Sequence, residues 1–409
     1  MQMNPLSISR LIFDTIPQLY EAKEGKHPVD LKLKGETTRV YSLVPLSKDL
    51  QRYLEEATRI WEDLRPMTEG DITQIIEREW IQQKFVVTWL ESQTKIKSWG
   101  RILDYSRRLS RRLTEQELHA KTLVIEPGIE PIEDIKLNDE DFFKVFDWLG
   151  STDHTYFRVD ENLNIRSYEA IPAIDSQAKD GFRFYPHFLQ PVIQSLKSDD
   201  SIVVHISEHA GIMIANRDGL IASKRALDSW TIYDIDHVLE SVAEVVKPKL
   251  ASNHCKAKPT NVACSLFQIL FDIIHKRHGG LVILDKHENL ARYVIKGIEK
   301  STDSPMRLLF NHAPSNELLY SVAEVRKLVE LSSVDGAVIL DLHGNLLQFG
   351  SMIMAHPDSP NRFGTREAAG YSAARYGATA FKISTDGEMS LFFTTPEMTG
   401  DDVHRFDFR

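Results

Sequence analysis

Apolar residues recur at helical spacing through the first part of the chain. Over residues 48–64 and again over residues 71–93, apolar side chains fall three or four positions apart, which predicts two amphipathic helices. A basic helix, RILDYSRRLSRRL (101–113), follows, and its arginines either face solvent or meet an anion. An extended piece at 31–46 comes before these helices. We therefore predict a largely helical N-terminal region over residues 1–120.

The pattern changes near residue 201. Four segments each combine a β-branched strand, a polar or glycine-containing turn and a second apolar strand, which is typical of β-hairpins. The four segments are 201–216, 279–295, 335–353 and 378–393, and helical patterns between them cover 235–246, 261–277, 321–331 and the run TREAAGYSAARYG. Strand pairs that alternate with helices predict a central mixed sheet flanked by helices, an α/β or α+β fold.

We expect a domain boundary within residues 245–260, where proline, lysine and small residues cluster. A mixed α/β middle region, a candidate sensor, would then cover 121–250, and a C-terminal domain would cover 255–400. Within the middle region, the segment SEHAGIMI (207–214) loosely echoes KISTDGEMSL (382–391). The middle region is therefore either a divergent copy of the later hairpin or an unrelated hairpin with similar chemistry.

Composition limits the classes of function. The 409 residues are 42% hydrophobic and 26% charged, as in soluble globular proteins, and the net charge of −10 argues against a broad nucleic-acid surface. The two cysteines, Cys255 and Cys264, fit neither a disulfide framework nor a zinc motif, which favours a cytoplasmic setting. No apolar run approaches the roughly 18 residues of a membrane span. The N-terminus also lacks the basic segment of a signal peptide.

The common catalytic motifs do not occur in the sequence. There is no P-loop, dinucleotide-binding glycine motif, His-Glu-x-x-His or Gly-x-Ser-x-Gly. Two histidine pairs, His205 with His209 and His275 with His278, have the look of metal ligands. Neither pair has a third ligand nearby in sequence, so ordinary structural histidines are the favoured interpretation.

Two short stretches suggest chemistry when they are taken together. Asp335 and Gly336 open a predicted strand, where a carboxylate can hold a divalent cation and glycine allows close approach of a ligand. Thr365 stands where its hydroxyl can cap the next helix, whose first amides favour an anion, and Arg366 adds donors suited to phosphate. The alternative is ordinary, because Asp-Gly is a common turn and Gly-Thr a common helix start. Spacing by itself leaves both interpretations open.

The order of motifs over residues 262–393 resembles the diadenylate cyclase (DAC) domain, which joins two ATP molecules into cyclic di-AMP. The matching pieces are GGLVIL (279–284), DGAVIL (335–340), GTREAA (364–369) and KISTDGEMSLFF (382–393). The resemblance implies a nucleotidyltransferase with a central mixed sheet between helices and a Mg²⁺ or Mn²⁺ cofactor. It also implies a homodimer in which two subunits present ATP to each other face to face. The preceding portion more weakly resembles sensor regions fused to bacterial DAC domains, and would regulate the enzyme.

The resemblance also implies roles for individual residues. Asp335 would hold the metal ion and help to activate the attacking ribose hydroxyl, while Gly336 and Ala337 would border the nucleotide. The triphosphate would be bound by the Gly-Thr-Arg motif and its neighbour, which are Gly364, Thr365, Arg366 and Glu367.

The chain departs from the family pattern directly after that motif. Glu367 and Ala368 stand where the family has histidine and a second arginine, and Val334 replaces a histidine common before Asp-Gly-Ala. Losing one charge-assisted contact typically costs about 1.5–3 kcal/mol. Glu367 is therefore a liability for phosphate binding, unless it serves as a metal ligand or contacts a base.

Three functional hypotheses follow from the sequence. The first is an active cyclase. The second is a catalytically silent nucleotide sensor, favoured by Glu367 and Ala368. The third makes the DAC-like domain a dimerising scaffold for an N-terminal protein-interaction module, in which a partner surface or an apolar core would use Trp61, Trp80, Trp89 and Trp99.

Overall fold

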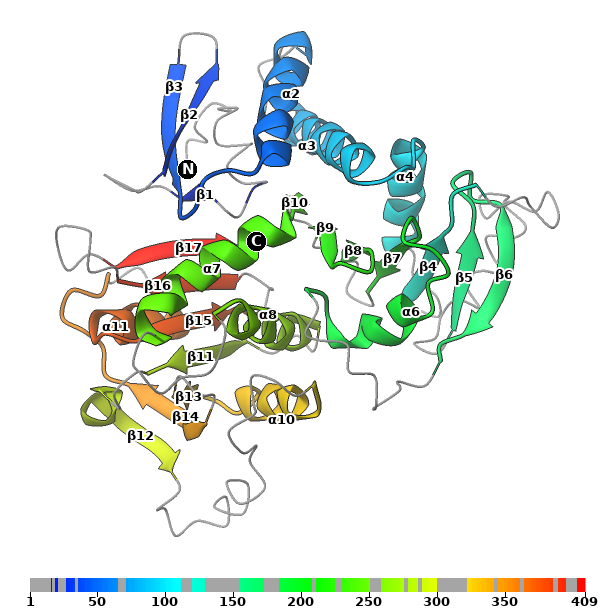
Figure 1. The fold of residues 1–409 in the computed structure, drawn as a ribbon. Coiled ribbons are helices and arrows are strands. Elements are labelled where there is room, and N and C mark those ends of the chain that lie inside the picture. Colours follow the sequence, from blue (N-terminus) through cyan, green and yellow to red (C-terminus); the bar gives the residue numbers. More distant parts are fainter. Residues whose placement is uncertain are drawn as a thin grey trace.

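The fold is described from a computed structural model, shown as a ribbon in Figure 1. The residues that it describes are 16, 19–20, 27–33, 36–64, 71–111, 120–128, 155–172, 184–207, 211–224, 230–250, 259–275, 279–285, 289–299, 322–341, 345–360, 364–384, 389–394 and 403–408.

The N-terminal region contains a small sheet as well as helices. Its elements are β1 (Leu19–Tyr20), β2 (His27–Leu33), β3 (Glu36–Ser42), α2 (Lys48–Leu64), α3 (Asp71–Gln93) and α4 (Trp99–Ser110). The helices predicted over 48–64 and 71–93 are confirmed, and the basic helix begins slightly earlier than expected. The extended piece predicted at 31–46 belongs to the β2–β3 hairpin of a three-stranded sheet, so this region is mixed rather than purely helical.

The middle region forms a seven-stranded mixed sheet with the strand order β10-β9-β8-β7-β4-β5-β6. Its elements are β4 (Lys121–Ile125), β5 (Thr155–Val159), β6 (Ile165–Ala170), η1 (His187–Leu189), α6 (Gln190–Gln194), β7 (Ile202–Ile206), β8 (Ile212–Ala215), β9 (Leu220–Lys224) and β10 (Trp230–Ile232). Strands β4 and β5 are parallel, and the other neighbours are antiparallel. Because its strands are short and largely buried, the sequence between 115 and 200 gives only a weak signal for them.

The C-terminal part forms a second seven-stranded mixed sheet with the order β12-β14-β13-β11-β15-β16-β17. Its elements are α7 (Ile235–Leu250), α8 (Pro259–His275), β11 (Gly280–Leu284), η2 (Asn289–Tyr293), β12 (Val294–Glu299), α10 (Val322–Ser332), β13 (Ala337–Leu340), β14 (Leu346–Ile353), α11 (Thr365–Arg375), β15 (Thr379–Ile383), β16 (Met389–Phe393) and β17 (His404–Phe408). The predicted mixed sheet flanked by helices is present, and β17 extends it past residue 400.

Three of the four predicted hairpins are confirmed, and the one over 279–295 is wrong. Strand β11 pairs with β13 and β15, while β12 pairs with β14. The reason lies at Asp285, whose backbone N–H donates to the Leu340 carbonyl at 2.9 Å while its carboxylate accepts the Leu290 N–H at 2.9 Å. That carboxylate holds the chain in the short helix η2, so a direct return into the sheet does not form.

The two large sheets share one topology. Six strands of each sheet correspond: β4–β9 in the middle sheet, and β11 with β13–β17 in the C-terminal sheet. Strand β4 is parallel to β5 and antiparallel to β7, and in the same way β11 is parallel to β13 and antiparallel to β15. Two more antiparallel strands follow in each sheet, β8 and β9 in one and β16 and β17 in the other. Helices α6 and α11 occupy corresponding connections. The two echoing segments of the sequence are the corresponding hairpins β7–β8 and β15–β16, joined by connections of equal length at 207–211 and 384–388. The middle region is thus a second copy of the C-terminal sheet architecture.

Corresponding turns in the two copies use the same hydrogen bonds. After β5, the Asp160 carboxylate accepts the backbone N–H of Asn164 at 2.8 Å and its side-chain amide at 2.7 Å. After β13, Asp341 accepts the same two groups of Asn345 at 2.8 and 2.6 Å. An aspartate that satisfies the turn in this way fixes the reversal into the next strand in both copies.

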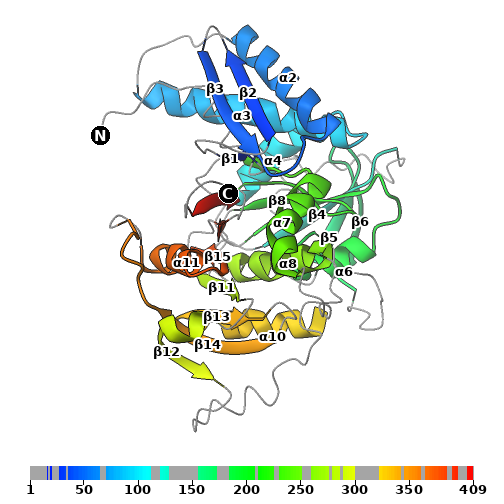
Figure 2. The ribbon, with the colours of Figure 1, turned by 60° about the vertical axis from the view of Figure 1, so that its left-hand side comes forward.

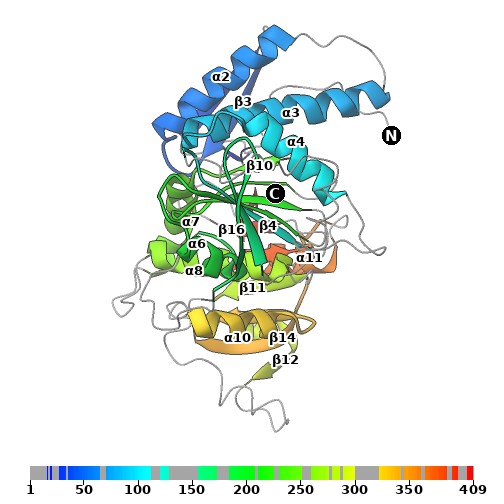
Figure 3. The ribbon, with the colours of Figure 1, turned by 90° about the vertical axis from the view of Figure 1, so that its right-hand side faces the viewer.

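The two copies stack in the same orientation, as the apolar clusters show. Helices α2–α4 cover one face of the middle sheet. The opposite face, with α6, packs on α7 and α8, which in turn cover the C-terminal sheet. Helix α11 covers the far face of that sheet. Figures 2 and 3 show the N-terminal helices at one end of the molecule and β12 and β14 at the other.

An aromatic cluster joins the two copies. Phe184, in the connection before η1, lies edge-on to Phe267 and Phe271 of α8, with ring centroids 4.6 and 5.4 Å apart. Phe184 also meets Tyr233 after β10 at 5.7 Å. Since aromatic pairs add to the burial of apolar area, this cluster ties the middle sheet to α8, which covers the C-terminal sheet.

We predict that Phe184→Ala destabilises both sheets together. Truncating a buried phenylalanine costs about 3–5 kcal/mol, and here the lost contacts belong to a core shared by the two copies. Chemical denaturation followed by near-UV circular dichroism should show one transition at lower denaturant. The exposed Met352→Ala, as control, should leave the midpoint nearly unchanged. Two separated transitions in the wild type would contradict a shared core.

A buried ion cluster supports the α6 face of the middle sheet. The Arg158 side chain, 2% exposed, pairs with Glu126 and donates to Glu169 at 2.8 Å. Burial by itself raises the pKa of the Glu169 carboxyl, but hydrogen bonds from Tyr156, Ser167 and Arg158 outweigh it and lower the pKa to about 2. In the C-terminal sheet the corresponding position holds the apolar Ile339, so this cluster belongs to the middle copy.

Folding stability should depend on acid through Glu169. Because the folded pKa lies below the ordinary value of 4.5, this carboxylate stabilises the fold above that pH and loses its contribution as the pH falls towards 2. The side chain is 31% exposed, so we expect a contribution of about 1–2 kcal/mol. Urea unfolding at about pH 6 and about pH 3 should show a smaller loss of stability in Glu169→Gln than in wild type. An equal loss in both proteins would contradict this role.

Candidate functional site

Asp335 lies at an exposed edge of the C-terminal sheet, directly before β13. Its carboxylate is fully exposed. The next residue, Gly336, has φ +108°, and a Cβ added there would lie 2.8 Å from the Ser351 nitrogen and 2.9 Å from the Gly350 Cα. Only glycine therefore allows β13 to begin this close to β14, and the approach presents Asp335 to solvent.

Thr365 is the first residue of helix α11, so it cannot be the N-cap residue of that helix. Its N-cap is Gly364, in an extended conformation, and no side chain caps the helix. The prediction that the Thr365 hydroxyl caps the helix is wrong, because Thr365 is already the first helical residue. The Gly364 carbonyl accepts the Ala368 N–H at 2.9 Å. With no side-chain cap on the first-turn amides, this helix end keeps its attraction for an anion.

Arg366 crosses from α11 to the start of β11. A Cβ added at Gly279 would collide with the Arg366 guanidinium, so glycine at this position makes room for the arginine. The guanidinium also approaches the Asp335 carboxylate at 4.0 Å, and the Arg366 side chain is 38% exposed. The sequence analysis assigns no role to Gly279, although this residue opens GGLVIL. A glycine directly before a predicted strand was the only sequence feature that could have indicated a close approach here.

Glu367 does not stand free in the first turn. Its carboxylate, 18% exposed, forms an ion pair with Arg405 of the C-terminal strand β17. The Arg405 guanidinium also lies over the Phe392 ring, 5.8 Å from the ring centroid. Sequence reasoning missed Arg405 because it lies 38 residues from Glu367 in no recognisable motif.

The structure brings the predicted residues to one edge of the sheet. The starts of the parallel strands β11 and β13 lie side by side there, and Arg366 of α11 reaches Gly279 before β11 and comes within 4.0 Å of Asp335 before β13. An exposed carboxylate and an arginine beside uncapped helix amides form a donor set suited to a phosphate chain with its cation.

The other sequence candidates have structural roles or lie outside the described residues. His205 is buried and shares a hydrogen bond with Thr122 at 3.0 Å, while His209 and His278 are outside the described residues. Where the chain is described, no group of three or more His, Cys, Asp or Glu side chains could hold a metal ion. Arg107 and Arg111 around the end of α4 approach Glu79 of α3 at 3.8 and 3.4 Å, as members of an intramolecular ion cluster.

The tryptophans of the helical region divide between core and surface. Trp89 and Trp99 are 1% and 0% exposed, and the Trp89 indole donates to the Ile221 carbonyl of β9 at 3.1 Å. These two residues hold α3 and α4 on the middle sheet. Trp80 is 48% exposed, and the Trp61 side chain is outside the described residues.

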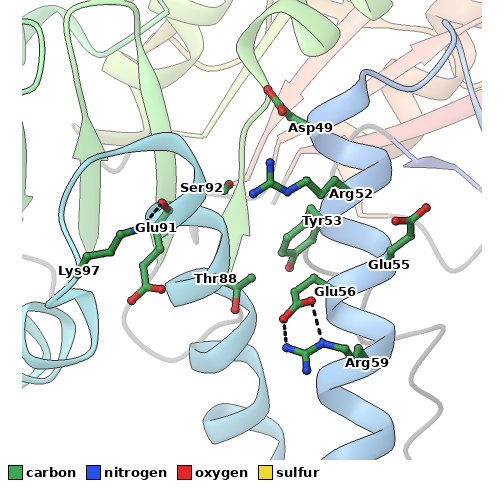
Figure 4. Close-up of a pocket in the computed structure, with 10 residues that line it drawn as sticks. All are labelled: Asp49, Arg52, Tyr53, Glu55, Glu56, Arg59, Thr88, Glu91, Ser92 and Lys97. Atoms are coloured by element: carbon green, nitrogen blue, oxygen red, sulfur yellow. Dashed lines mark hydrogen bonds and ion pairs between the residues drawn. The ribbon is translucent and has the colours of Figure 1, made fainter.

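A groove of about 480 Å³ lies between α2 and α3, away from the edge that holds Asp335 (Figure 4). Cations and carboxylates alternate along the walls of the groove. The Arg59 guanidinium already donates to both carboxylate oxygens of Glu56, with 2.9 Å between the Arg59 Nε and the Glu56 Oε2. The Tyr53 hydroxyl beneath it is buried. The groove therefore offers no clear charge preference for a ligand.

No family model matches the chain, and no curated protein matches it. A crystal structure of a hypothetical membrane-spanning protein from Bacillus cereus is 13% identical, over 42% of this chain and 72% of that one, with a TM-score of 0.27. A double mutant of DacA, a diadenylate cyclase, from Staphylococcus aureus is 19% identical, over 37% of this chain and 89% of that one, with a TM-score of 0.25. Both TM-scores are too low to establish a common fold.

Among the described residues, no helix has the length and apolar character needed to cross a bilayer.

We predict that Gly279→Ala weakens anion binding at the start of α11. The added methyl displaces the Arg366 guanidinium, a flexible group, while the backbone oxygen of Ile383, 3.3 Å away, needs to shift by only a few tenths of an ångström. Affinity for inorganic triphosphate, measured by calorimetry, should fall roughly tenfold or more. The effect should vanish in an Arg366→Ala background. Gly100→Ala adds the same methyl where nothing lies within 4 Å, and should leave the affinity unchanged. Equal affinity in wild type and Gly279→Ala would contradict the site.

Proposed function

We propose that the chain is a nucleotidyltransferase that condenses two ATP molecules into cyclic di-AMP, controlled by its N-terminal regions. The observation that carries this proposal is the meeting of Asp335 and Arg366 beside the uncapped start of α11, across the glycine positions 279 and 336. Residues from three of the four DAC-like motifs, far apart in sequence, thus support the proposal together. The weak likeness to a diadenylate cyclase structure agrees with this proposal and is not its basis.

The reaction needs positioning more than covalent help from the protein. A ribose 3′-hydroxyl of one ATP attacks the α-phosphorus of the other, a P–O ester bond forms, and the bond to the β-phosphate breaks to release pyrophosphate. A second, reciprocal attack closes the ring. In this proposal the Arg366 guanidinium and the amides of residues 365 and 366 hold phosphate oxygens, and Asp335 receives or orients the hydroxyl proton.

The donor set fits a divalent cation that arrives with the nucleotide. Asp335 is a single exposed carboxylate, and Mg²⁺ is commonly held by one or two carboxylates together with substrate phosphates. When bound, Mg²⁺ or Mn²⁺ would neutralise phosphate charge and make the α-phosphorus more electrophilic. Asp335 is the residue that would hold it.

The second nucleotide must come from a second chain. The middle copy packs on the α8 side of the C-terminal sheet, whereas α11 covers the opposite side. The internal copy therefore does not face the Asp335–Arg366 edge, and in this proposal a face-to-face homodimer supplies the other ATP.

A silent nucleotide sensor is the second candidate. The observation that favours it is Glu367, a carboxylate in the first turn of α11 where the DAC pattern has histidine. A sensor would bind ATP through the same edge without turnover, and the exposed Trp80 on α3 would then belong to a partner surface.

The decisive assay is incubation of purified protein with ATP in Mg²⁺ or Mn²⁺, with products identified by liquid chromatography and mass spectrometry. Cyclic di-AMP should form in wild type, and Asp335→Asn should lower the rate by at least a hundredfold, about 2.7 kcal/mol in the activation barrier. Asp358→Asn, which changes an exposed carboxylate at the other end of α11, is the matched control and should remain active. ATP binding without product would favour the sensor, and absence of binding would contradict both candidates.

A further inference from the structure

The C-terminal strand β17 meets the first turn of α11 through one ion pair. Glu367 is the third residue of the helix, where a glutamate usually reaches back to the N-cap backbone. Here its carboxylate instead pairs with Arg405 of β17. Both side chains are partly buried, at 18% and 33% exposure, so solvent screens the pair less than an ordinary surface pair.

The position of Arg405 is fixed by its neighbour in the sheet, Phe392. In the β16–β17 ladder Arg405 stands directly opposite Phe392, and its guanidinium lies over that ring. Phe392 is fully buried under α11 in the outermost apolar cluster. The arginine therefore starts from a sheet position next to α11 and does not reach the helix from a distant loop.

The pair changes the charge that an incoming phosphate chain meets. Arg366 and Glu367 alone would cancel each other at the start of α11, and a carboxylate within the first turn repels phosphate. With Arg405 added, Arg366, Glu367 and Arg405 carry one net positive charge, and together with Asp335 the four side chains sum to zero instead of −1. Arg405 also fixes the Glu367 carboxylate on the β17 side, while Arg366 is directed to the opposite neighbour, Gly279.

We propose that Arg405 is a positioning residue of the nucleotide site: by neutralising Glu367 it makes the start of α11 competent to bind the triphosphate of ATP. This inference rests on the nucleotide-binding function proposed above. Arg405 supplies, from strand β17, the positive charge that the Gly-Thr-Arg-Glu motif lacks, and it acts through its ion pair with Glu367.

A double-mutant cycle tests this role, with ATP affinity measured by calorimetry in the full-length chain. Arg405→Ala should weaken ATP binding roughly ten- to a hundredfold, because it leaves Glu367 uncompensated. Glu367→Gln should bind ATP as well as wild type or better. In the Glu367→Gln background, Arg405→Ala should change the affinity by less than about threefold. Arg405→Lys, which keeps the charge, should restore much of the affinity.

The matched control lies at the other end of the same helix. Arg375 pairs with Asp358 at 2.8 Å, so Arg375→Ala removes one charge and one ion pair without touching the first turn. It should leave ATP affinity within about twofold of wild type. Thermal unfolding of each variant without nucleotide separates any loss of fold from loss of binding.

Several outcomes would overturn the inference. If Arg405→Ala weakens binding equally in both backgrounds, Arg405 does not act through Glu367. If it lowers thermal stability but leaves ATP affinity unchanged, the pair only anchors β17. If wild type does not bind ATP at all, the proposed function itself fails, and the inference fails with it.

Discussion

The structure depends on the apolar layer formed by α7 and α8 between the two large sheets. Each sheet turns one apolar face towards the other sheet, and α8 covers both of these faces by packing on the C-terminal sheet and against Phe184 of the middle copy. A single helix layer shared by two sheets makes the copies one cooperative body. The outer edge with Asp335 and α11 is left uncovered by the first copy.

The two copies have diverged in what they do with the same architecture. The turns at Asp160 and Asp341 share two hydrogen bonds to the asparagine four residues later, which preserves the reversal into the following strand. The middle copy fills its α6 face with the Arg158 ion cluster and with aromatic rings that meet α8. The C-terminal copy keeps small residues and charged groups at the start of α11. Structural work and candidate chemistry are thus divided between the copies.

Much of this could be predicted from the sequence, for physical reasons. The helix over 48–64 follows a strong apolar period and the helix over 71–93 a weaker one, and the hairpins at 335–353 and 378–393 follow strand patterns with clear turn residues. The hairpin expected at 279–295 failed because periodicity does not show that the Asp285 carboxylate holds a short helix. The topology of the middle sheet was beyond sequence reasoning, since its strands are short and pair with partners far along the chain.

The candidate site was partly predictable for a similar reason. Asp335, Gly336 and Arg366 belong to local motifs, so their residue types already suggest phosphate and metal chemistry. Arg405 and Gly279 matter through contacts across the sheet, which no local pattern reveals. The cap assigned to Thr365 was displaced by one residue, because Gly364 can take the N-cap conformation itself. The residues of the candidate site could be proposed from local motifs, but the long-range partner of Glu367 could not.

The measurement that tests the account most directly is amide hydrogen exchange of the full-length chain, with and without ATP and Mg²⁺, followed by mass spectrometry. The account predicts that nucleotide slows exchange in peptides covering residues 335–337 and 364–368. Peptides from α2 and α3 around the groove that holds Arg59, and from α6 in the middle copy, should be unchanged. Protection confined to the groove or to the middle copy, with none at the start of α11, would contradict the claim that this edge is the nucleotide site.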